Sequence, residues 1–498
     1  MKHFPDKIIN CLVHIFNLSL DQGKFISSFK RAKVVPIHKS DDKQDMKNYR
    51  PISLLPVASK ILEKIMYNRV YSFLDRHSFF YQNQYGFRSS HSTELAGSFL
   101  INQICSAIDK NMKVMSVFLD MSKAFDCVDH QILLKKLYRY GIRDKALSWF
   151  VSYLSDRTQR VCFNGTLSEN ICSIKSGVPQ GSILGPLLYL IYVNDFHMCL
   201  NRSSAILFAD DTTLVVASSD YKELYKMVNE DLMNLNKWLC LNKLTINLTK
   251  TKYMVYSLNN ASAQPPSNLN IRLNGTKVDR VEVYKFLGVT LDHRLNWKPH
   301  MSKLLSKIQR NLGIVRKISY FLNRKSLLKL FHSMIMSHIR YGITLWHHGQ
   351  IAVRKKIQAC ANKFLRMIFL LKKRDSVKNT MISQKLLSVN QIFNLEVGKF
   401  MQRLALEIIP IPFLSMFSDQ ERVSERETRS ASIYFQPHTS KSKCKQSIRF
   451  TGPLIWNAIP NAVKKSTNEM LDNRVFVRTS EQLDQNATWL PTNTFVKK

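Results

Sequence analysis

The sequence predicts an α+β fold in which buried strands are covered by amphipathic helices. Residues 114–119, 205–208 and 212–217 form short apolar runs of strand length, which is typical of buried strands. Between residues 61 and 74, and again along 220–241, apolar positions recur at helical spacing. Acidic residues end the apolar runs, so we expect these acids to stand at the mouth of a sheet.

Three carboxylates stand at the ends of the apolar runs. Asp120 follows the first run directly, and Asp210 and Asp211 separate the second run from the third. Mg²⁺ prefers oxygen ligands, and two such ions roughly 3.5–4 Å apart can clamp the attacking and leaving oxygens of phosphoryl transfer. Taken alone, an Asp-Asp pair is also typical of a plain hairpin turn, and Asp120 of a helix N-cap. The order of the surrounding motifs decides between these interpretations.

Seven ordered segments carry a resemblance to a known family: residues 48–53, 84–88, 117–126, 176–186, 208–211, 244–252 and 286–289. They resemble the fingers, catalytic and primer-grip motifs of reverse transcriptases of the non-LTR retrotransposon type. Within that type, the chain resembles the LINE, jockey-like branch. The resemblance implies a right-hand polymerase with fingers, an α+β palm and a helical thumb, and it implies RNA-directed DNA polymerase activity.

The resemblance also implies roles for the acidic residues and for one lysine. Asp120 and Asp210 are expected as the principal ligands of two Mg²⁺ ions, with Mn²⁺ as an alternative ion and Asp211 as a supporting acid. Lys250 aligns as the general acid that protonates the departing pyrophosphate, although Lys252 lies only two residues further on.

Four residues are expected around the incoming nucleotide. By resemblance, Lys39 and Arg50 reach the triphosphate, where negative charge builds in the transition state. Phe125 lies five residues after Asp120, where the resemblance implies an aromatic ring beneath the sugar that would exclude a ribose 2′-hydroxyl and favour dNTPs. Gln180 lies in a loop bounded by glycine and proline residues and would contact the nucleotide or the template.

Three other charged residues are interpreted more cautiously from the sequence. Asp126 and Asp129 follow the first catalytic motif, and we interpret them as exposed positions on the next helix. Arg88 fits a structural salt bridge as well as it fits a phosphate contact.

The charge distribution predicts a polyanionic partner. Formal net charge is +37, and residues 293–374 hold 19 Lys or Arg and no acid. We expect this segment to bind the template-primer duplex, with four cations as candidate contacts: Arg316, Lys317, Arg324 and Lys325. Four aromatic residues interleave with the cations and permit base stacking, without favouring a particular one: Tyr320, Phe321, Tyr341 and Trp346.

A chain of 498 residues exceeds what one core usually holds, so several domains are expected. We predict an N-terminal helix and fingers at 1–112, a palm with the remaining fingers elements and the primer grip at 113–292, a basic helical thumb at 293–375, and a C-terminal region at 376–498. The reverse transcriptase domain is expected at about 30–292. A polar, charge-mixed segment at about 419–445 predicts a disordered linker.

The remaining features concern the cellular context. Nine cysteines without framework spacing predict reduced thiols in an intracellular protein, in the nucleus, the cytoplasm or both. The longest apolar stretch, 183–193, is too short to cross a bilayer and predicts a buried helix, so no membrane is expected. Expected partners are an RNA template, a DNA primer and dNTPs, with any endonuclease supplied in trans. The alternative is a truncated, catalytically inactive remnant that still binds nucleic acid.

Overall fold

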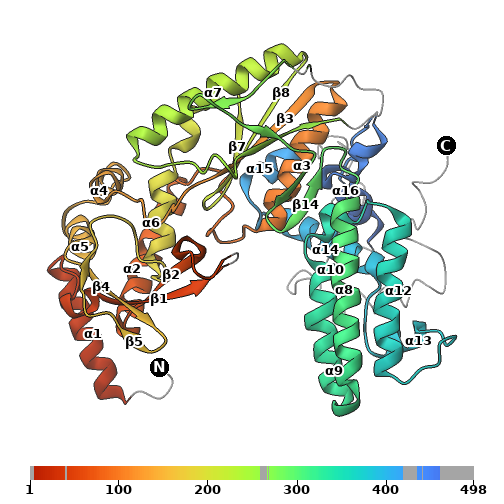
Figure 1. Cartoon of the computed structure of the whole chain (residues 1–498), viewed down its shortest axis with the longest axis horizontal. Coiled ribbons are helices and arrows are strands. Elements are labelled where there is room, and N and C mark those ends of the chain that lie inside the picture. The colour runs from red at the N-terminus through yellow and green to blue at the C-terminus, as the bar shows by residue number, and fades with distance from the viewer. Residues whose placement is uncertain are drawn as a thin grey trace, which may run out of the picture.

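The computed structural model describes residues 5–39, 42–257, 266, 268–418, 434–439 and 441–459 (Figure 1). Its main sheet has five strands in the order β12-β9-β3-β8-β7. The strands are β3 (Lys113–Asp120), β7 (Ser204–Phe208), β8 (Asp211–Ser218), β9 (Lys252–Tyr256) and β12 (Asp279–Arg280). β8 pairs antiparallel with both β3 and β7. The three apolar runs therefore lie side by side in one sheet, and the predicted α+β class is confirmed.

Both faces of this sheet are buried, which explains why its strands read as continuous apolar runs. Along β3, Val114 and Phe118 belong to one hydrophobic core, whereas Met115, Val117 and Leu119 belong to a second. Alternate side chains of a strand point to opposite faces. The sheet therefore separates two cores, and its ends are the places where polar groups reach solvent.

The second core is covered by α2 (Val57–Arg76), α4 (His130–Arg139), α5 (Asp144–Leu154), α6 (Leu184–Val193) and α7 (Tyr221–Leu241). The helix predicted over 220–241 is α7, and Asp220 caps its first turn. The predicted buried helix is α6, which is apolar on all sides. Glu63 of α2 accepts hydrogen bonds from the backbone N–H groups of Ile183 and Leu184, at 2.8 and 3.3 Å. A buried carboxylate thus caps α6 from a neighbouring helix.

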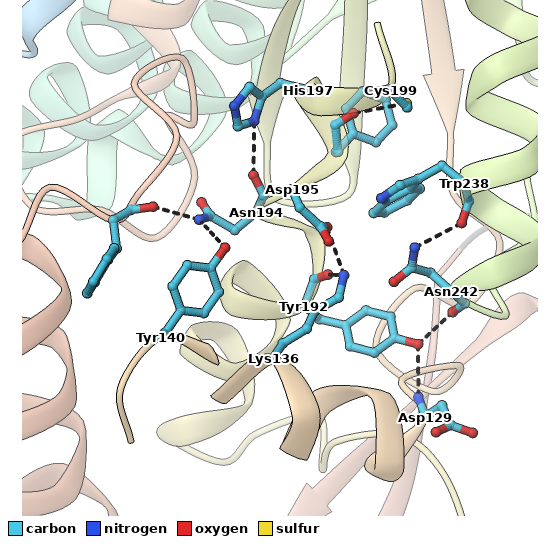
Figure 2. A network of polar contacts seen from close by, with 12 residues as sticks. Asp129, Lys136, Tyr140, Tyr192, Asn194, Asp195, His197, Cys199, Trp238 and Asn242 are labelled. Atoms are coloured by element: carbon cyan, nitrogen blue, oxygen red, sulfur yellow. Dashed lines mark hydrogen bonds and ion pairs between the residues drawn. The ribbon is translucent and has the colours of Figure 1, made fainter. Parts of the chain in front are cut away.

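A polar network holds the C-terminal end of α6 against α4 and α7 (Figure 2). Lys136 of α4 donates to the Tyr192 carbonyl at 2.5 Å and pairs with Asp195 at 2.7 Å. The Tyr192 hydroxyl donates to the Asn242 carbonyl at 2.5 Å. Burial lowers the pKa of Lys136, although the charge of Asp195 opposes this shift. Both ends of α6 are therefore fixed by hydrogen bonds to buried or half-buried groups.

A second sheet contains β1 (Arg31–His38), β2 (Tyr49–Leu54), β4 (Thr158–Phe163), β5 (Thr166–Leu167) and β6 (Cys172–Ser173). β1 pairs antiparallel with β2 and parallel with β4. The helix α1 (Asp6–Asp21) lies beside α5. In Figure 1 this sheet lies at the left, across from the helices that follow the main sheet. Because β4 follows β3 in the chain, segments before and after the first catalytic motif build the sheet together.

Two hairpins follow β9: the first lies between β9 and β12 of the main sheet, and the second connects β12 to the basic segment. β10 (Arg272–Leu273) pairs with β11 (Thr276–Lys277), and β13 (Val283–Phe286) pairs with β14 (Val289–Asp292). The helices that follow are α8 (Lys298–Ile318), α9 (Arg324–Phe331), a π-helical turn (His332–Met336), α10 (Ser337–Arg340), α11 (Ile343–Trp346) and α12 (Ile351–Ile368). The predicted helical character of this segment is confirmed. In the described part of the chain, no helix has the length and apolar character needed to cross a bilayer.

The C-terminal helices pack on the first core and on α3 (Thr93–Asp109): they are α13 (Lys378–Ser383), α14 (Val389–Ala405), α15 (Ile411–Ser418) and α16 (Ile448–Ala458). Within the predicted linker, residues 419–433 and 440 lie outside the described residues. Residues 460–498, beyond the linker, also lie outside them. Tyr434 and Cys444 are buried, and the Cys444 thiol donates to the Cys105 carbonyl on α3. The linker prediction is therefore wrong for this end of the segment, because a polar composition does not reveal a distant packing partner.

Asp231 of α7 supplies a test of stability. It is fully buried and accepts hydrogen bonds from the backbone N–H groups of Asn201, Arg202 and Ser203, just before β7. Asp231→Ala should lower the free energy of unfolding by about 2–3 kcal/mol, because three backbone N–H groups lose their charged acceptor. Urea unfolding measured by circular dichroism checks this. The neighbouring variant Glu230→Ala removes only an exposed ion pair and should cost less than about 0.5 kcal/mol; equal losses would contradict the assignment.

Candidate active site

The register of the main sheet brings the three predicted metal ligands to one end of it. Asp120 is the last residue of β3 and pairs directly with Asp211, the first residue of β8. Asp210 precedes it, in the turn that joins β7 to β8. The Asp-Asp pair is thus part of a hairpin turn and also part of an acidic cluster.

The turn that carries Asp210 has a strained backbone. Ala209 has a φ of 56°, in the left-handed region that is unfavourable for residues with a side chain. The Gln84 side-chain oxygen accepts hydrogen bonds from Gly86 N–H at 2.9 Å and from Ala209 N–H at 3.2 Å. A Cβ at Gly86 would lie 2.3 Å from the Ala209 nitrogen, so only glycine fits there. The segment around Gln84 therefore clamps the acidic turn.

Burial and mutual repulsion disfavour the charged forms of Asp210 and Asp211. Burial raises the pKa of Asp210, and the charge of Asp120 raises it further. Burial, followed by the charges of Asp210 and Asp120, raises the pKa of Asp211 to about 6. Lys39 opposes both shifts, which places its charge within electrostatic reach of the pair. A divalent cation at this position would relieve the repulsion.

The donor set fits Mg²⁺ in its chemistry, since carboxylate oxygens are the hard ligands that this ion prefers. Asp120, Asp210 and Asp211 are the residues that would hold it. Within the ranges that the structure describes, no group of three or more His, Cys, Asp or Glu side chains is arranged to hold a metal ion unaided.

The predicted cations divide clearly between site and surroundings. Arg50 and Lys39 both lower the pKa of Asp210 through their charge. Lys250 Nζ lies 3.4 Å from an Asp120 carboxylate oxygen, whereas Lys252 pairs with Asp279 at 2.7 Å, away from the site. The geometry therefore favours Lys250 over Lys252.

Phe125 lies between two other rings. It stacks on Tyr189 of α6 at 4.8 Å between centroids and meets Phe87 edge-on at 6.2 Å. Tyr189 is fully buried, so Phe125 rests on the core and cannot retreat into it. Arg88, next to Phe87, pairs with Asp75 at 3.7 Å, which agrees with its structural interpretation.

Gln180 is held by a residue that we had interpreted as an exposed helix position. Its side-chain N–H donates to Asp126 Oδ1 at 2.8 Å, and its carbonyl accepts from Ser53 N–H of β2 at 2.7 Å. The sequence interpretation of Asp126 was therefore wrong, and so was that of Asp129, which caps α4 and pairs with Lys243 at 2.6 Å. Local periodicity gives no signal for either contact, because both partners are distant in the chain.

The four predicted thumb cations do not reach the acidic cluster. Arg316 and Lys317 lie in the last turn of α8, and Arg324 and Lys325 begin α9. All four are exposed. They form a group of their own at the far end of α8 from the main sheet.

A mostly antiparallel sheet with three carboxylates at one end, flanked by the sheet that contains β1, β2 and β4 and by the basic helices α8 to α12, defines a right-hand nucleic-acid polymerase. A family model described as reverse transcriptase (RNA-dependent DNA polymerase) matches residues 37–291. The chain belongs to the reverse transcriptase family.

The chain is also similar in sequence to proteins named as RNA-directed DNA polymerases. The chain is 30% identical over 388 residues to a probable RNA-directed DNA polymerase from transposon BS of Drosophila melanogaster, covering 74% of this chain and 41% of that protein. It is 28% identical to the RNA-directed DNA polymerase from mobile element jockey of the same species, covering 80% and 44%. The chain thus spans less than half the length of these relatives. A structure of apo telomerase from Candida tropicalis matches with a TM-score of 0.44 and 14% identity, covering 76% of this chain and 66% of that one.

The Asp126–Gln180 contact predicts a selective kinetic effect. Asp126→Ala should raise the KM for dNTPs on the order of tenfold with little change in kcat, because the Gln180 amide loses its charged partner. Asp126→Asn keeps an acceptor and should stay close to the parent. Gln180→Glu places a second carboxylate against Asp126 and should therefore raise the KM for dNTPs. The double variant Asp126→Asn/Gln180→Glu removes this repulsion and should recover the parent KM. Steady-state single-nucleotide extension measures all four; an unchanged KM in Asp126→Ala would refute the contact's role.

Proposed function

We propose that this chain catalyses RNA-directed DNA synthesis, extending a DNA primer 3′-hydroxyl with dNTPs along an RNA template. The observation that carries the proposal is the convergence of Asp120, Asp210 and Asp211 at one sheet end, in a chain of the reverse transcriptase family. The relatives from transposon BS and mobile element jockey are named for the same activity. Primer extension on poly(rA)/oligo(dT) by the purified chain tests it directly.

The three acids would hold two Mg²⁺ ions, or Mn²⁺, which supply Lewis-acid stabilisation of the attacking and leaving oxygens. The chain's own cations would bind the triphosphate and protonate the leaving group. Lys39 and Arg50 bind its oxygens and offset the developing negative charge. Lys250 donates a proton to the departing pyrophosphate, and its ion pair with Asp120 holds the ammonium group at the site.

Two further residues select the nucleotide. Phe125, supported by Tyr189, occupies the space that a ribose 2′-hydroxyl would need, so dNTPs are favoured. Gln180, with its N–H turned to Asp126, presents its side-chain oxygen to the nucleotide or template. The orientation follows from chemistry, because an ionised carboxylate accepts hydrogen bonds and cannot donate them.

The basic helices bind the template-primer duplex in this proposal. Fingers at 1–112, palm at 113–292, thumb at 293–375 and a C-terminal region at 376–498 remain our proposed division of the chain. We propose an intracellular location, in the nucleus, the cytoplasm or both; all nine cysteines lie in the described residues and are free thiols, which agrees with a reducing compartment.

Removal of a metal ligand separates catalysis from binding. Asp120→Ala or Asp210→Ala should abolish primer extension while template-primer affinity stays nearly unchanged, because each change alters the acidic site and leaves the basic helices intact. Gel-based extension and fluorescence anisotropy measure the two properties. Wild-type extension by either variant would refute the assignment. A parent chain that binds and fails to extend would favour the inactive remnant instead.

Sugar selection depends on the size of residue 125. Phe125→Val removes the ring that rests on Tyr189 and opens space for a 2′-hydroxyl, so incorporation of rNTPs relative to dNTPs should rise on the order of a hundredfold, as about 3 kcal/mol of steric exclusion is lost. Phe125→Tyr keeps the ring and serves as control. The ratio of kcat/KM for the two nucleotides decides the matter, and an unchanged ratio in a folded Val variant removes the role.

A further inference from the structure

Two of the four aromatic residues that the sequence singles out as stacking candidates lie fully on the surface. Tyr320 is 89% exposed and Phe321 is 86% exposed, in the single 3-10 turn (Ser319–Phe321) between α8 and α9. By contrast, Trp346 is buried and the Tyr341 hydroxyl donates to the β13–β14 turn. Adjacent rings exposed to this degree are unusual on a protein surface and are typical of binding sites.

A second apolar element lies next to this turn. The Arg324 guanidinium stacks on the Phe369 ring at 5.3 Å, which joins the start of α9 to the end of α12. Leu370, the following residue, is 86% exposed. Exposed cations lie at the end of α8, at the start of α9 and shortly after the end of α12: Arg316, Lys317, Lys325, Lys372, Lys373 and Arg374. We call Tyr320, Phe321, Leu370 and these cations the thumb tip.

The charge of the thumb tip is one-sided. No acid occurs between residues 293 and 374, and the Asp375 carboxylate accepts the backbone N–H of Lys372 in a local turn. Among the described residues, none of the tip cations forms an ion pair with an acidic side chain. Exposed rings among unpaired cations match the chemistry of single strands, in which phosphates and base faces are both accessible.

We propose that the thumb tip binds unpaired nucleotides of a single-stranded nucleic acid, with Tyr320 and Phe321 stacking on bases and the flanking cations contacting phosphates. The inference rests on the proposed polymerase function and adds a second contact to it. α8 has 21 residues, so its far end lies roughly 30 Å from the β13–β14 hairpin. That distance corresponds to about nine base steps, so the tip meets a part of the strand remote from the acidic cluster.

Stacking distinguishes this ligand from the duplex. Bases in a double helix are stacked on their neighbours, so an exposed ring gains base contact only where the strand is unpaired. Cations alone would bind duplex and single strand through phosphates. The rings therefore predict a preference that the charge does not.

The test uses the full chain without dNTPs and labelled 12-mers: U12 RNA, T12 DNA, an abasic 12-mer and an RNA–DNA duplex. Tyr320→Ala/Phe321→Ala should raise the Kd for U12, T12 or both by roughly tenfold to a hundredfold and leave the abasic and duplex affinities unchanged. The two single-strand arms identify whether RNA or DNA is preferred. A control pair, Met198→Ala and Leu241→Ala, removes side chains that are 74% and 77% exposed elsewhere and should change none of the four.

A charge variant provides the contrasting result. Neutralising Arg316, Lys317, Arg324 and Lys325 to Gln should weaken binding of all four ligands and flatten the salt dependence by roughly 2.8 in log K per log salt for single strands. Extension products should shorten, because dissociation then competes with the next addition. An unchanged salt slope would show that these side chains are solvated surface.

Position is read by photocrosslinking of U12 containing 4-thiouridine. An adduct at Tyr320 or Phe321 supports the proposal. The absence of any adduct at Ser319–Phe321 together with an unchanged Kd in the aromatic variant overturns it, as does an equal loss of duplex affinity. The binding test contains no dNTP and does not depend on catalysis. A parent chain that fails to extend a primer in the separate extension assay would therefore refute the polymerase proposal and leave this binding result unchanged.

Discussion

The pairing of β3 with β8 is the constraint on which the site depends. It sets Asp120 opposite Asp211, and like charges in opposite positions of a sheet repel by about 1 kcal/mol or less. Five side chains of β3, from Val114 to Leu119, are buried in two cores. At about 1.5–3 kcal/mol each, as an upper estimate, their burial contributes roughly ten times more than the repulsion removes. Hydrophobic burial therefore fixes the register, and the register fixes the acids.

A second unfavourable element lies beside the first. The left-handed Ala209 costs on the order of 1–3 kcal/mol and persists because Gln84 binds its N–H and Gly86 lets the two backbones approach. Strain and repulsion thus meet in one turn. Both lie where the proposed function places Asp210 as a metal ligand.

The sequence predicted the elements that local pattern determines. The apolar runs, the helix over 220–241 and the carboxylates at the strand ends follow from periodicity and short-range order, and the motif order identified the family. The roles of Asp126, Glu63 and Gln84 did not follow, because each acts through a partner 54 or more residues away. The packed Cys444 was missed for the same reason. The composition of a segment does not indicate which distant segment it packs against.

Long-range backbone contacts also join the segments that carry the residues proposed to contact the nucleotide. Ser53 N–H of the fingers sheet donates to the Gln180 carbonyl at 2.7 Å, and Val178 N–H donates to the Phe125 carbonyl at 2.9 Å. At Gly181, φ is 112° and a Cβ would lie 2.8 Å from the Ser53 carbonyl oxygen, so the approach requires glycine. The strand that carries Arg50, the segment that carries Phe125 and the loop that carries Gln180 are therefore mutually fixed. Substitutions in these three segments should not act additively, because each displaces the hydrogen-bonded partners of the others. In the proposed function, sugar selection and triphosphate binding would therefore depend on one hydrogen-bonded unit.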